Sequence, residues 1–574
     1  MSGQLRISVG QHSDKGRKET NQDFPGFSVP LEPQLTTKGV AFCLADGISS
    51  SNVSQIASQA AVNGFLTDYY CTPDAWSVKK SARCVLFALH AWLHSQTRQS
   101  QFRYERDKGY ICAFSALVVK SATAYLFHAG DVRIYRLRNG ALEQLTDDHR
   151  LWVTQVQSHL SRALGLNPHA ELDYREVPVR QGDVFILATD GVYEHIGCPF
   201  VVETLEANRN DLDRAARAIV QAAYENGSED NLSVQVARID ALPDGQAHEI
   251  VRQRDELPLP PALTARMELD GYRIVRELHA SHRSHIYLAQ DTLTGTQVVI
   301  KTPSVDLSGD PAYLERMLLE EWIARRVNNA HVVKACPSTR RRSCIYVVTE
   351  FVEGQTLSQW MRDNPQPDLE TVRNVIEQIA RGLRALHRLE ILHQDLRPEN
   401  IMIDRAGTVK IIDLGAARVA GLAESTRRLE APVMLGTEQY SAPEYFLGER
   451  ATARSDLFSL GVITYQMLTG RLPYGTQVPK ARTRSAQAKL RYRSVMGEDR
   501  EVPAWLDEAI RKAVDPNPYR RYEALSEYIY DLRHPNAGFL RKARAPLLER
   551  NPAAFWRVVS LVLLVIVIVL LAND

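Results

Sequence analysis

The chain has 574 residues, too many for one hydrophobic core, and the usual size of roughly 150 residues per domain predicts two to four domains. Hydrophobic residues make up 44% and charged residues 24%, as in average globular proteins, which excludes a wholly disordered or fibrous chain. Lys and Arg (69) nearly balance Asp and Glu (68), so no basic field marks the chain and no nucleic-acid partner is expected. Seven scattered cysteines without a C-x-x-C pair favour reduced thiols over disulfides or a zinc site.

The expected elements divide the chain into parts. Residues 1–240 alternate apolar strand-like runs, such as GVAFCLADG and DVFILATDG, with helical stretches, which predicts a mixed α and β domain. Residues 241–268 contain a Pro-rich, polar stretch without periodicity, as expected of a linker. Residues 269–535 begin with strand-like runs and continue mostly with helical ones. We therefore expect an α+β chain in which the second domain has a small β-rich lobe and a larger helical lobe.

Acidic residues stand at the ends of strand-like runs in the first domain. Five carboxylates share this setting, two of them in Asp-Gly pairs that end an apolar strand: Asp23, Asp46, Asp131, Asp190 and Asp230. Carboxylates that converge without basic partners repel one another, so the pattern indicates bound hard cations such as Mg²⁺ or Mn²⁺. For Asp131, an ordinary hairpin turn in G-D-V-R explains the residue equally well.

Five motifs of the first domain occur in the order found in the type 2C metal-dependent protein phosphatases, the PPM family, which the domain resembles: K-E-T-N-Q-D (18–23), L-A-D-G (44–47), G-D-V-R (130–133), A-T-D-G-V (188–192) and E-D-N-L-S (229–233). The resemblance implies a β-sandwich flanked by helices that hydrolyses phosphoserine and phosphothreonine. It also implies two Mg²⁺ or Mn²⁺ ions that lower the pKa of a bridging water.

The same resemblance implies a role for each acidic residue. Asp46 would bridge the two metals, with the Gly47 carbonyl on one of them. Asp190 and Asp230 would be ligands of the other metal. Asp23 would be an outer-shell or second-metal carboxylate, and Asp131 would be a ligand of a third metal. The family's phosphate-binding Arg falls on Lys18, with Arg17 beside it, and both residues stay candidates. No side chain is assigned as the general acid.

A second set of ordered motifs, within 269–535, resembles the eukaryotic-type Ser/Thr protein kinases: V-V-I-K (298–301), H-Q-D-L-R-P-E-N (393–400), I-I-D-L-G (411–415), G-T-E-Q-Y-S-A-P-E (436–444), S-D-L-F-S-L-G-V (455–462) and D-P-N-P-Y-R-R-Y (515–522). The resemblance implies a two-lobed kinase fold that uses ATP with Mg²⁺ to phosphorylate protein Ser and Thr.

Roles in phosphoryl transfer follow from this second resemblance. Lys301 would hold the α- and β-phosphates and pair with Glu320, Glu321 being the less favoured register. In the catalytic loop, Asp395 would accept or orient the substrate hydroxyl, and Arg397 replaces the usual Lys. Asn400 and Asp413, the latter in the D-L-G motif, would hold Mg²⁺. Three further residues of the kinase motifs are expected to have structural roles. Glu444 and Arg521 would form an ion pair, and Asp456 would brace the catalytic loop.

Two departures from the kinase pattern bear on activity. The glycine positions of the Gly-rich loop carry His279, Ser281 and Ser284, and without glycine the backbone approaches phosphates less freely. Weaker nucleotide binding is therefore expected, and a degenerate kinase that acts as a binding or scaffold module stays an alternative to an active one. Gln394 replaces the Arg that reads activation-loop phosphate in many members, so phosphorylation is expected to control this kinase less, or by another route.

The C-terminal residues predict a membrane anchor. Residues 553–572 end in VVSLVLLVIVIVLLA, and 20 residues at 1.5 Å each span the roughly 30 Å bilayer core. Basic residues precede this run in a juxtamembrane segment, 536–552, so the positive-inside rule places the catalytic domains in the cytoplasm. We expect a single-pass protein of the inner membrane, with a buried core helix as the alternative reading of the run.

Together these patterns predict a membrane-anchored bifunctional enzyme, a protein phosphatase fused to a protein kinase. Its partners are expected to be proteins with Ser, Thr or their phosphorylated forms. They include its own activation segment, 413–444, where Ser425 and Thr426 are the expected autophosphorylation sites. The phosphatase would reset its own kinase by removing these phosphates, since a linker of this length keeps the two domains at high effective concentration.

Overall fold

The computed structural model describes residues 4–152, 158–243, 257–281, 284–304, 310–336, 340, 342–422, 438–496 and 502–536, and near the C-terminus 556–557, 559–560 and 562–563. The chain forms two compact units. Unit 1 comprises Met1–Phe351, Arg388–Ile391 and Asp413–Glu430, and unit 2 the rest of the chain.

The N-terminal part of unit 1 is a sandwich of two five-stranded antiparallel sheets. The first sheet has the order β1 (Arg6–Asp14), β12 (Leu232–Ala241), β11 (Val184–Ala188), β6 (Arg133–Arg138), β7 (Ala141–Gln144). The second has the order β10 (Asp173–Pro178), β5 (Thr123–Ala129), β4 (Cys112–Lys120), β3 (Val40–Gly47), β2 (Asp23–Ser28). A separate short pair is formed by β8 (Arg150–Trp152) and β9 (Ser158–Leu160).

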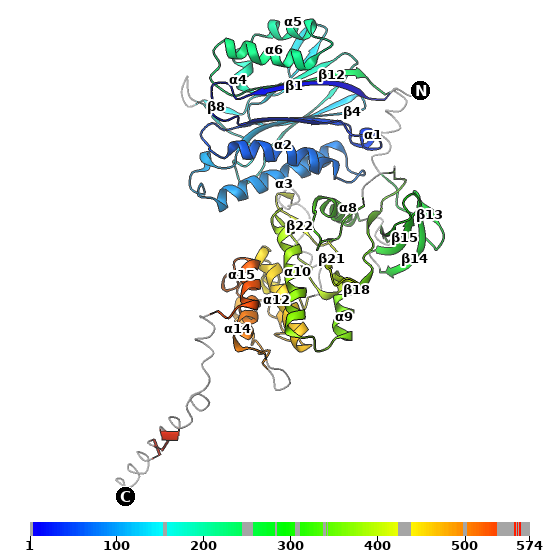
Figure 1. Ribbon diagram of the computed structural model, residues 1–574, viewed down its shortest axis with the longest axis vertical. Helices are drawn as coiled ribbons and strands as arrows, with labels where there is room; N and C mark the ends of the chain where they lie inside the picture. Colours follow the sequence, from blue (N-terminus) through cyan, green and yellow to red (C-terminus); the bar gives the residue numbers. More distant parts are fainter. Residues whose placement is uncertain are drawn as a thin grey trace. The chain divides into compact units, whose positions relative to one another are not determined.

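Helices cover both outer faces of the sandwich (Figure 1). The second sheet is covered by α2 (Ser54–Tyr70) and α3 (Val78–Gln99), with the short α1 (Gln34–Lys38) at its edge, and the first sheet by α4 (Asp190–Tyr193), α5 (Cys198–Ala207) and α6 (Leu212–Glu225). All nine residues of β4 are buried, as expected of a strand covered on both faces. On α6 the buried residues recur at helical spacing, so one apolar face packs on β1 and β12.

The rest of unit 1 contains a third antiparallel sheet and one long helix. The sheet has the order β13 (Glu268–Leu269), β14 (Tyr272–Ala280), β15 (Ser284–Asp291), β16 (Gln297–Pro303), β17 (Val347–Glu350). The helix α8 (Pro311–Arg326) contacts β17 and is capped by Asp310, whose side chain accepts hydrogen bonds from the amides of Ala312 and Tyr313. Short strands β19 (Ile391–Leu392) and β22 (Arg418–Val419) also pair.

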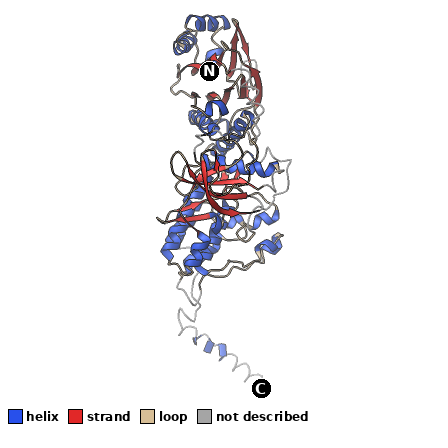
Figure 2. Cartoon of the chain, turned by 90° about the vertical axis from the view of Figure 1, so that its right-hand side faces the viewer, coloured by secondary structure: helices blue, strands red, loops and turns tan. Residues whose placement is uncertain are grey.

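Unit 2 is mostly helical (Figure 2). Its helices are α9 (Leu357–Asp363), α10 (Leu369–His387), α12 (Ala453–Thr469), α13 (Arg484–Gln487), α14 (Ala504–Ala513) and α15 (Leu525–Arg533). A small sheet has the order β18 (Gly354–Thr356), β20 (Ile401–Asp404), β21 (Val409–Ile411). Thirteen residues of α12 are buried, so this helix forms the centre of the unit, and α10 and α14 pack on it.

The predicted fold class is confirmed for the two folded domains: a sandwich flanked by helices precedes a β-rich sheet and a helical part. Residues 244–256 of the predicted linker, the predicted sites Ser425 and Thr426, and most of the span 553–572 lie outside the described residues. In the part of the chain that the structure describes, no helix is both long and apolar enough to cross a membrane.

Candidate active sites

Two predicted carboxylates face each other on neighbouring strands. Asp23 begins β2 and lies opposite Asp46 in the register of β2 and β3. Thr189 directly precedes α4, and its hydroxyl donates to Asp23 Oδ2 over 2.9 Å. Asp23 Oδ1 is buried, and no hydrogen bond reaches it from the described residues. An unsatisfied buried carboxylate oxygen is costly, so this position favours a cation as its partner.

The ends of two adjacent strands of the other sheet supply Asp190 and Asp230. Asp190 follows β11 and begins α4, whereas Asp230 lies two residues before β12. A Cβ atom at Gly191 would lie 2.1 Å from the Asn231 carbonyl oxygen, so only glycine lets these two strand ends approach so closely. The pairing of β11 with β12 therefore brings together two carboxylates that are 40 positions apart in the sequence.

Burial and mutual repulsion raise the pKa values of three of these carboxyl groups. Burial, followed by repulsion from Asp23, Asp190, Asp131 and Asp230, raises the pKa of Asp46 well above its usual range. Burial also raises the pKa of Asp23 to about 6. For Asp190, burial and the charges of Asp131 and Asp230 raise the pKa to about 7. The cluster is thus strongly stabilised by any positive charge placed among its oxygens.

Two cationic side chains of the chain itself approach the cluster. Lys18 Nζ forms an ion pair with Asp230 and donates to the Ser49 hydroxyl over 2.8 Å. Arg17 points elsewhere: its guanidinium donates to the backbone carbonyls of Ser228 and Tyr224 and lies over the Tyr224 ring. Of the two candidates for a phosphate-binding residue, the structure places only Lys18 beside the carboxylates.

Arg150 is the second cation, and the sequence analysis missed it. From β8 its guanidinium donates to Asp131 Oδ2 (2.7 Å), Asp190 Oδ2 (2.6 Å) and Glu194 Oε1 (2.9 Å). Its side chain is 15% exposed. No sequence pattern announces this contact, because Arg150 and Asp190 are brought together by the tertiary fold.

The donor set suits a hard divalent cation, since carboxylate oxygens are the ligands that Mg²⁺ and Mn²⁺ prefer. The buried, unpartnered Asp23 Oδ1 and the raised pKa of Asp46 also fit such an ion. Among the described residues, however, no three His, Cys, Asp or Glu side chains form a group that could hold a metal. Lys18 and Arg150 contact three of the five carboxylates instead.

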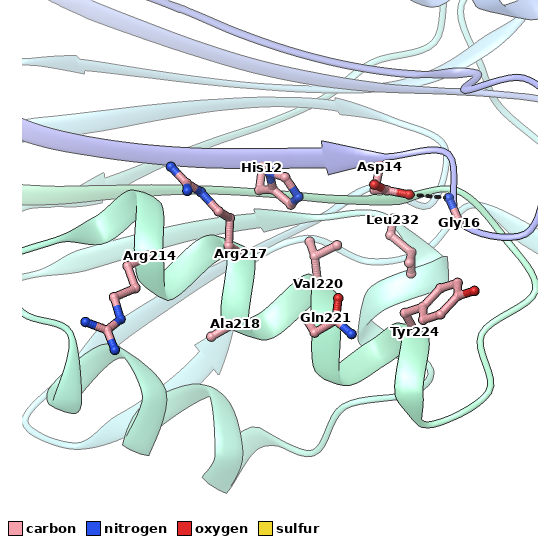
Figure 3. A pocket seen from close by; sticks show the side chains of 10 residues that line it. All are labelled: His12, Asp14, Gly16, Arg214, Arg217, Ala218, Val220, Gln221, Tyr224 and Leu232. Carbon is pink, nitrogen blue, oxygen red and sulfur yellow. Dashed lines mark hydrogen bonds between the residues drawn. The ribbon is translucent and has the colours of Figure 1, made fainter.

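A cavity of about 550 Å³ lies beside the sandwich between β1 and α6 (Figure 3). Its lining includes His12, Arg214, Arg217 and Tyr224, and Asp14 at its edge accepts a hydrogen bond from the Gly16 amide. None of the predicted site residues lines this cavity. It is therefore separate from the carboxylate cluster.

The predicted nucleotide-binding lysine of unit 1 is held by two carboxylates. Lys301 Nζ on β16 lies 2.7 Å from Glu320 Oε2 on α8 and 3.6 Å from Asp413 Oδ1. Burial disfavours the charged amine, but Asp413 and Glu320 outweigh it and raise the pKa of Lys301. Glu321 faces away: it is fully buried and pairs with Arg342 and Arg325. Helix α8 therefore places Glu320, not Glu321, against Lys301.

The hairpin at the predicted Gly-rich loop is closed by serines. The Ser281 amide donates to the Ser284 carbonyl (3.0 Å), and the Ser284 amide donates to the Ser281 hydroxyl (3.1 Å). His279 is exposed on β14 opposite Ile286. Both serine amides are thus engaged within the hairpin, whereas a glycine loop would offer its amides to phosphates.

Unit 2 carries the predicted catalytic loop. Asn400 Nδ2 donates to Asp395 Oδ2 (3.0 Å) and to the Asp395 carbonyl (2.9 Å), so Asn400 fixes the aspartate. Arg397 Nε lies 3.6 Å from Asp395 Oδ2. Asn400 and Arg397 thus both lie against the Asp395 carboxylate.

Asp456 braces this loop, and the Glu444–Arg521 ion pair braces the end of the activation segment. Asp456, at the start of α12, accepts the amides of His393 and Gln394 (2.9 Å each). Gln394 has a left-handed φ of 65°, and Asp456 stabilises this unusual backbone. Arg521 donates to both oxygens of Glu444 (2.8 and 2.7 Å) in a buried pair.

Comparisons with known protein families match both parts of the chain. A family described as protein phosphatase 2C matches residues 13–239, and one described as protein kinase domain matches residues 272–529. Serine/threonine-protein kinase PrkC of Bacillus subtilis (strain 168) is 29% identical over 263 residues, which cover 46% of this chain and 40% of PrkC. Serine/threonine-protein kinase PknB of Mycobacterium leprae (strain TN) is 30% identical over 286 residues, which cover 49% of this chain and 44% of PknB. The chain thus spans less than half the length of these curated relatives.

Two solved structures that are similar to this chain are described as serine/threonine phosphatases. The S. agalactiae serine/threonine phosphatase has 20% identity and a TM-score of 0.36, and the match covers 41% of this chain and all of that one. The catalytic domain of the serine threonine protein phosphatase PstP, solved in complex with two manganese ions, has 22% identity, a TM-score of 0.34 and the same coverage.

Proposed function

Because the chain carries a protein phosphatase 2C domain followed by a Ser/Thr protein kinase domain, we propose that it is a bifunctional signalling enzyme. The kinase phosphorylates proteins on Ser and Thr with ATP, and the phosphatase hydrolyses the same phosphate groups. The observation that carries the phosphatase assignment is the carboxylate cluster around Asp46, in which buried acidic groups converge from both sheets.

We propose that Asp46, the Gly47 carbonyl, Asp190 and Asp230 hold two Mg²⁺ or Mn²⁺ ions. Asp23 would support this site, and Asp131 would serve a third ion. Such ions supply Lewis acidity that activates water and stabilises charge on the phosphate. Lys18, whose amine lies beside Asp230, would hold a phosphate oxygen of the substrate.

The test of the phosphatase is hydrolysis of a phosphothreonine peptide with Mn²⁺. Asp46→Asn should lower the rate by at least about 100-fold, because it removes a ligand, and Mn²⁺ binding measured by calorimetry should weaken with it. Asp240→Asn is the matched control, since Asp240 lies near the opposite end of β12 from Asp230. Full hydrolysis by Asp46→Asn, or in EDTA, would refute the two-metal assignment.

For the kinase, the arrangement of Lys301, Glu320 and Asp413 supports an active enzyme, because the cation needed for the phosphates is already positioned. The serine-closed hairpin supports the alternative, a degenerate kinase that acts as a scaffold. Binding of ATP-Mg²⁺ and autophosphorylation of the full chain separate the two. Asp395→Asn should abolish phosphorylation but keep nucleotide binding. A scaffold would show no phosphorylation in the wild type.

We propose that the activation segment is a shared substrate of the two domains. Labelled ATP should then leave more phosphate on residues 421–441 in Asp46→Asn than in the wild type. Equal labelling of the two, with an active wild-type phosphatase, would exclude this reset.

The apolar run 553–572 and the basic residues before it support a single-pass anchor in the inner membrane, with both catalytic domains in the cytoplasm. This anchor is a proposal from the sequence.

A further inference from the structure

A tryptophan on the helix that carries Glu320 is completely covered. Trp322 on α8 has no exposed surface. Because successive residues of a helix turn by about 100°, Trp322 projects roughly 200° away from Glu320. Arg326 follows four residues after Trp322 and so shares its face. Helix α8 thus presents Glu320 to Lys301 on one side and Trp322 with Arg326 on the other.

Within unit 1, helix α2 and the turn between α2 and α3 contact this second face. The Trp322 indole N–H donates to the Asp68 carbonyl over 3.3 Å, and the Trp322 ring packs at a tilt on Trp76 with centroids 6.0 Å apart. Arg326 Nε lies 2.6 Å from Asp68 Oδ2, and both side chains are at most 10% exposed. A buried ion pair and a buried Trp are anchors that a loose contact does not form.

Helix α3 makes a second contact with the kinase. The Trp92 indole N–H donates to the Arg388 carbonyl (3.1 Å), and the Ser95 hydroxyl donates to Glu390 (2.7 Å). The Glu390 carbonyl in turn accepts the amide of Ala420, in the segment that follows Asp413.

That segment itself approaches α3 closely. Gly421 has a left-handed φ of 81°, and a Cβ atom there would lie 2.4 Å from the Phe87 carbonyl oxygen. Helix α2 therefore touches the helix that carries Glu320, and helix α3 touches the segment that follows Asp413.

We propose that the α2 and α3 face of the phosphatase domain is a docking surface for its own kinase, and that this contact holds Glu320 in place against Lys301. The phosphatase then supports nucleotide binding through contact, independently of its own catalysis. The Asp68 contact lies at the C-terminal end of α2, whereas Gly47 of the carboxylate cluster packs against Ser54 at the N-terminal end of the same helix, so the contact leaves phosphatase chemistry free. The predicted effect of docking on ATP binding rests on the proposed kinase function, whereas the docking contact itself does not.

The test uses the full chain and a charge swap. Arg326→Asp should weaken binding of a non-hydrolysable ATP analogue with Mg²⁺ by about tenfold, as expected when one site is coupled to another. It should also speed hydrogen exchange of residues 311–326. The double variant Arg326→Asp with Asp68→Arg should restore both to near the wild-type values, which a merely structural defect would not allow.

Two further variants complete the design. Trp92→Phe removes the indole donor to Arg388 while keeping an aromatic ring, and should also weaken analogue binding. Glu206→Ala is the control, because Glu206 on α5 pairs with Arg209, both side chains are more than half exposed, and the change should alter neither readout. Phosphothreonine hydrolysis with Mn²⁺ should be unchanged throughout.

Wild-type analogue binding and exchange in Arg326→Asp, or no recovery in the double variant, would overturn the docking proposal. A wild-type chain that binds no nucleotide would instead refute the kinase assignment. In that case the docking proposal is tested by hydrogen exchange of residues 311–326 alone. Faster exchange in Arg326→Asp that returns to the wild-type rate in the double variant would support docking, and unchanged exchange in Arg326→Asp would overturn it.

Discussion

At the scale of single residues, Arg150 places a fixed positive charge among the carboxylates proposed as metal ligands. Its guanidinium and a divalent cation need the same oxygens of Asp131 and Asp190. We predict that Arg150→Ala binds Mn²⁺ about tenfold more tightly than the wild type, or binds one ion more, as measured by calorimetry on the full chain.

The control for this prediction is Arg133→Ala, because Arg133 pairs with Asp148 rather than with the cluster. Its Mn²⁺ affinity and stoichiometry should equal those of the wild type. Mn²⁺ binding by Arg150→Ala that is unchanged or weaker would show that Arg150 helps to build the metal site instead of competing for it.

Lys38 provides a prediction about pH. Lys38 is 1% exposed, and its amine donates to the Thr72 and Ser81 hydroxyls and the Pro73 carbonyl. Burial lowers the pKa of Lys38 from 10.5 to about 7, against an opposing effect of Asp74. Between these two values the unfolded chain binds more protons than the folded one, so the free energy of unfolding should rise with pH by up to about 1.4 kcal/mol per unit.

Urea unfolding between pH 7.5 and 9.5 checks this slope. Lys38→Met should lose the contribution, whereas Lys489→Met, at an exposed position, should keep the wild-type slope. Parallel curves for the wild type and Lys38→Met would contradict the prediction.

The sequence predicted roles for residues whose chemistry is specified by a local motif, such as Asp46, Asp190 and Lys301. The sequence could not decide whether Lys18 or Arg17 binds phosphate, because the two residues are adjacent. In the structure, Arg17 contacts Tyr224 and Ser228 at the end of α6 and so points away from the carboxylates. Arg150 could not be recognised at all, since its partners lie at distant positions in the chain.

At the scale of elements, the start of α12 holds the catalytic loop in an unfavourable backbone conformation. Burial opposes the charge of Asp456, but hydrogen bonds from His387 and Gln394 outweigh it and lower the pKa of Asp456. We predict that Asp456→Asn lowers the free energy of unfolding by about 1–3 kcal/mol, because an amide cannot accept all of these donors, and that it impairs phosphorylation. Urea unfolding and a kinase assay measure both effects.

The control is Glu353→Gln, which removes a pair with Arg405 in which both side chains are more than half exposed. Its stability should stay within about 0.5 kcal/mol of the wild type. An equal loss in the two variants would mean that Asp456 has no special role as a brace.

Elements were predictable where apolar residues form clear runs, as in the two strands that lead into Asp46 and Asp190. Their pairing order was not, because the register of β2 and β3, which opposes Asp23 to Asp46, is a long-range property of the sheet.

At the scale of the whole molecule, we predict that deleting residues 553–574 releases the protein from membranes while both catalytic activities remain measurable. The reason is that this segment lies outside both matched domains. Membrane flotation of the full-length and truncated chains measures the change, and a full-length chain that stays in solution would contradict the proposed anchor.

By itself the sequence determined that a phosphatase domain precedes a kinase domain, because each motif needs particular side chains at short, fixed spacing for metal or phosphate chemistry. Only the tertiary structure decided which cations stand among the carboxylates, which glutamate of α8 meets Lys301, and that Trp322 and Arg326 are buried against α2. These contacts join residues that are many positions apart, so they depend on how sheets and helices pack, and no local pattern encodes them.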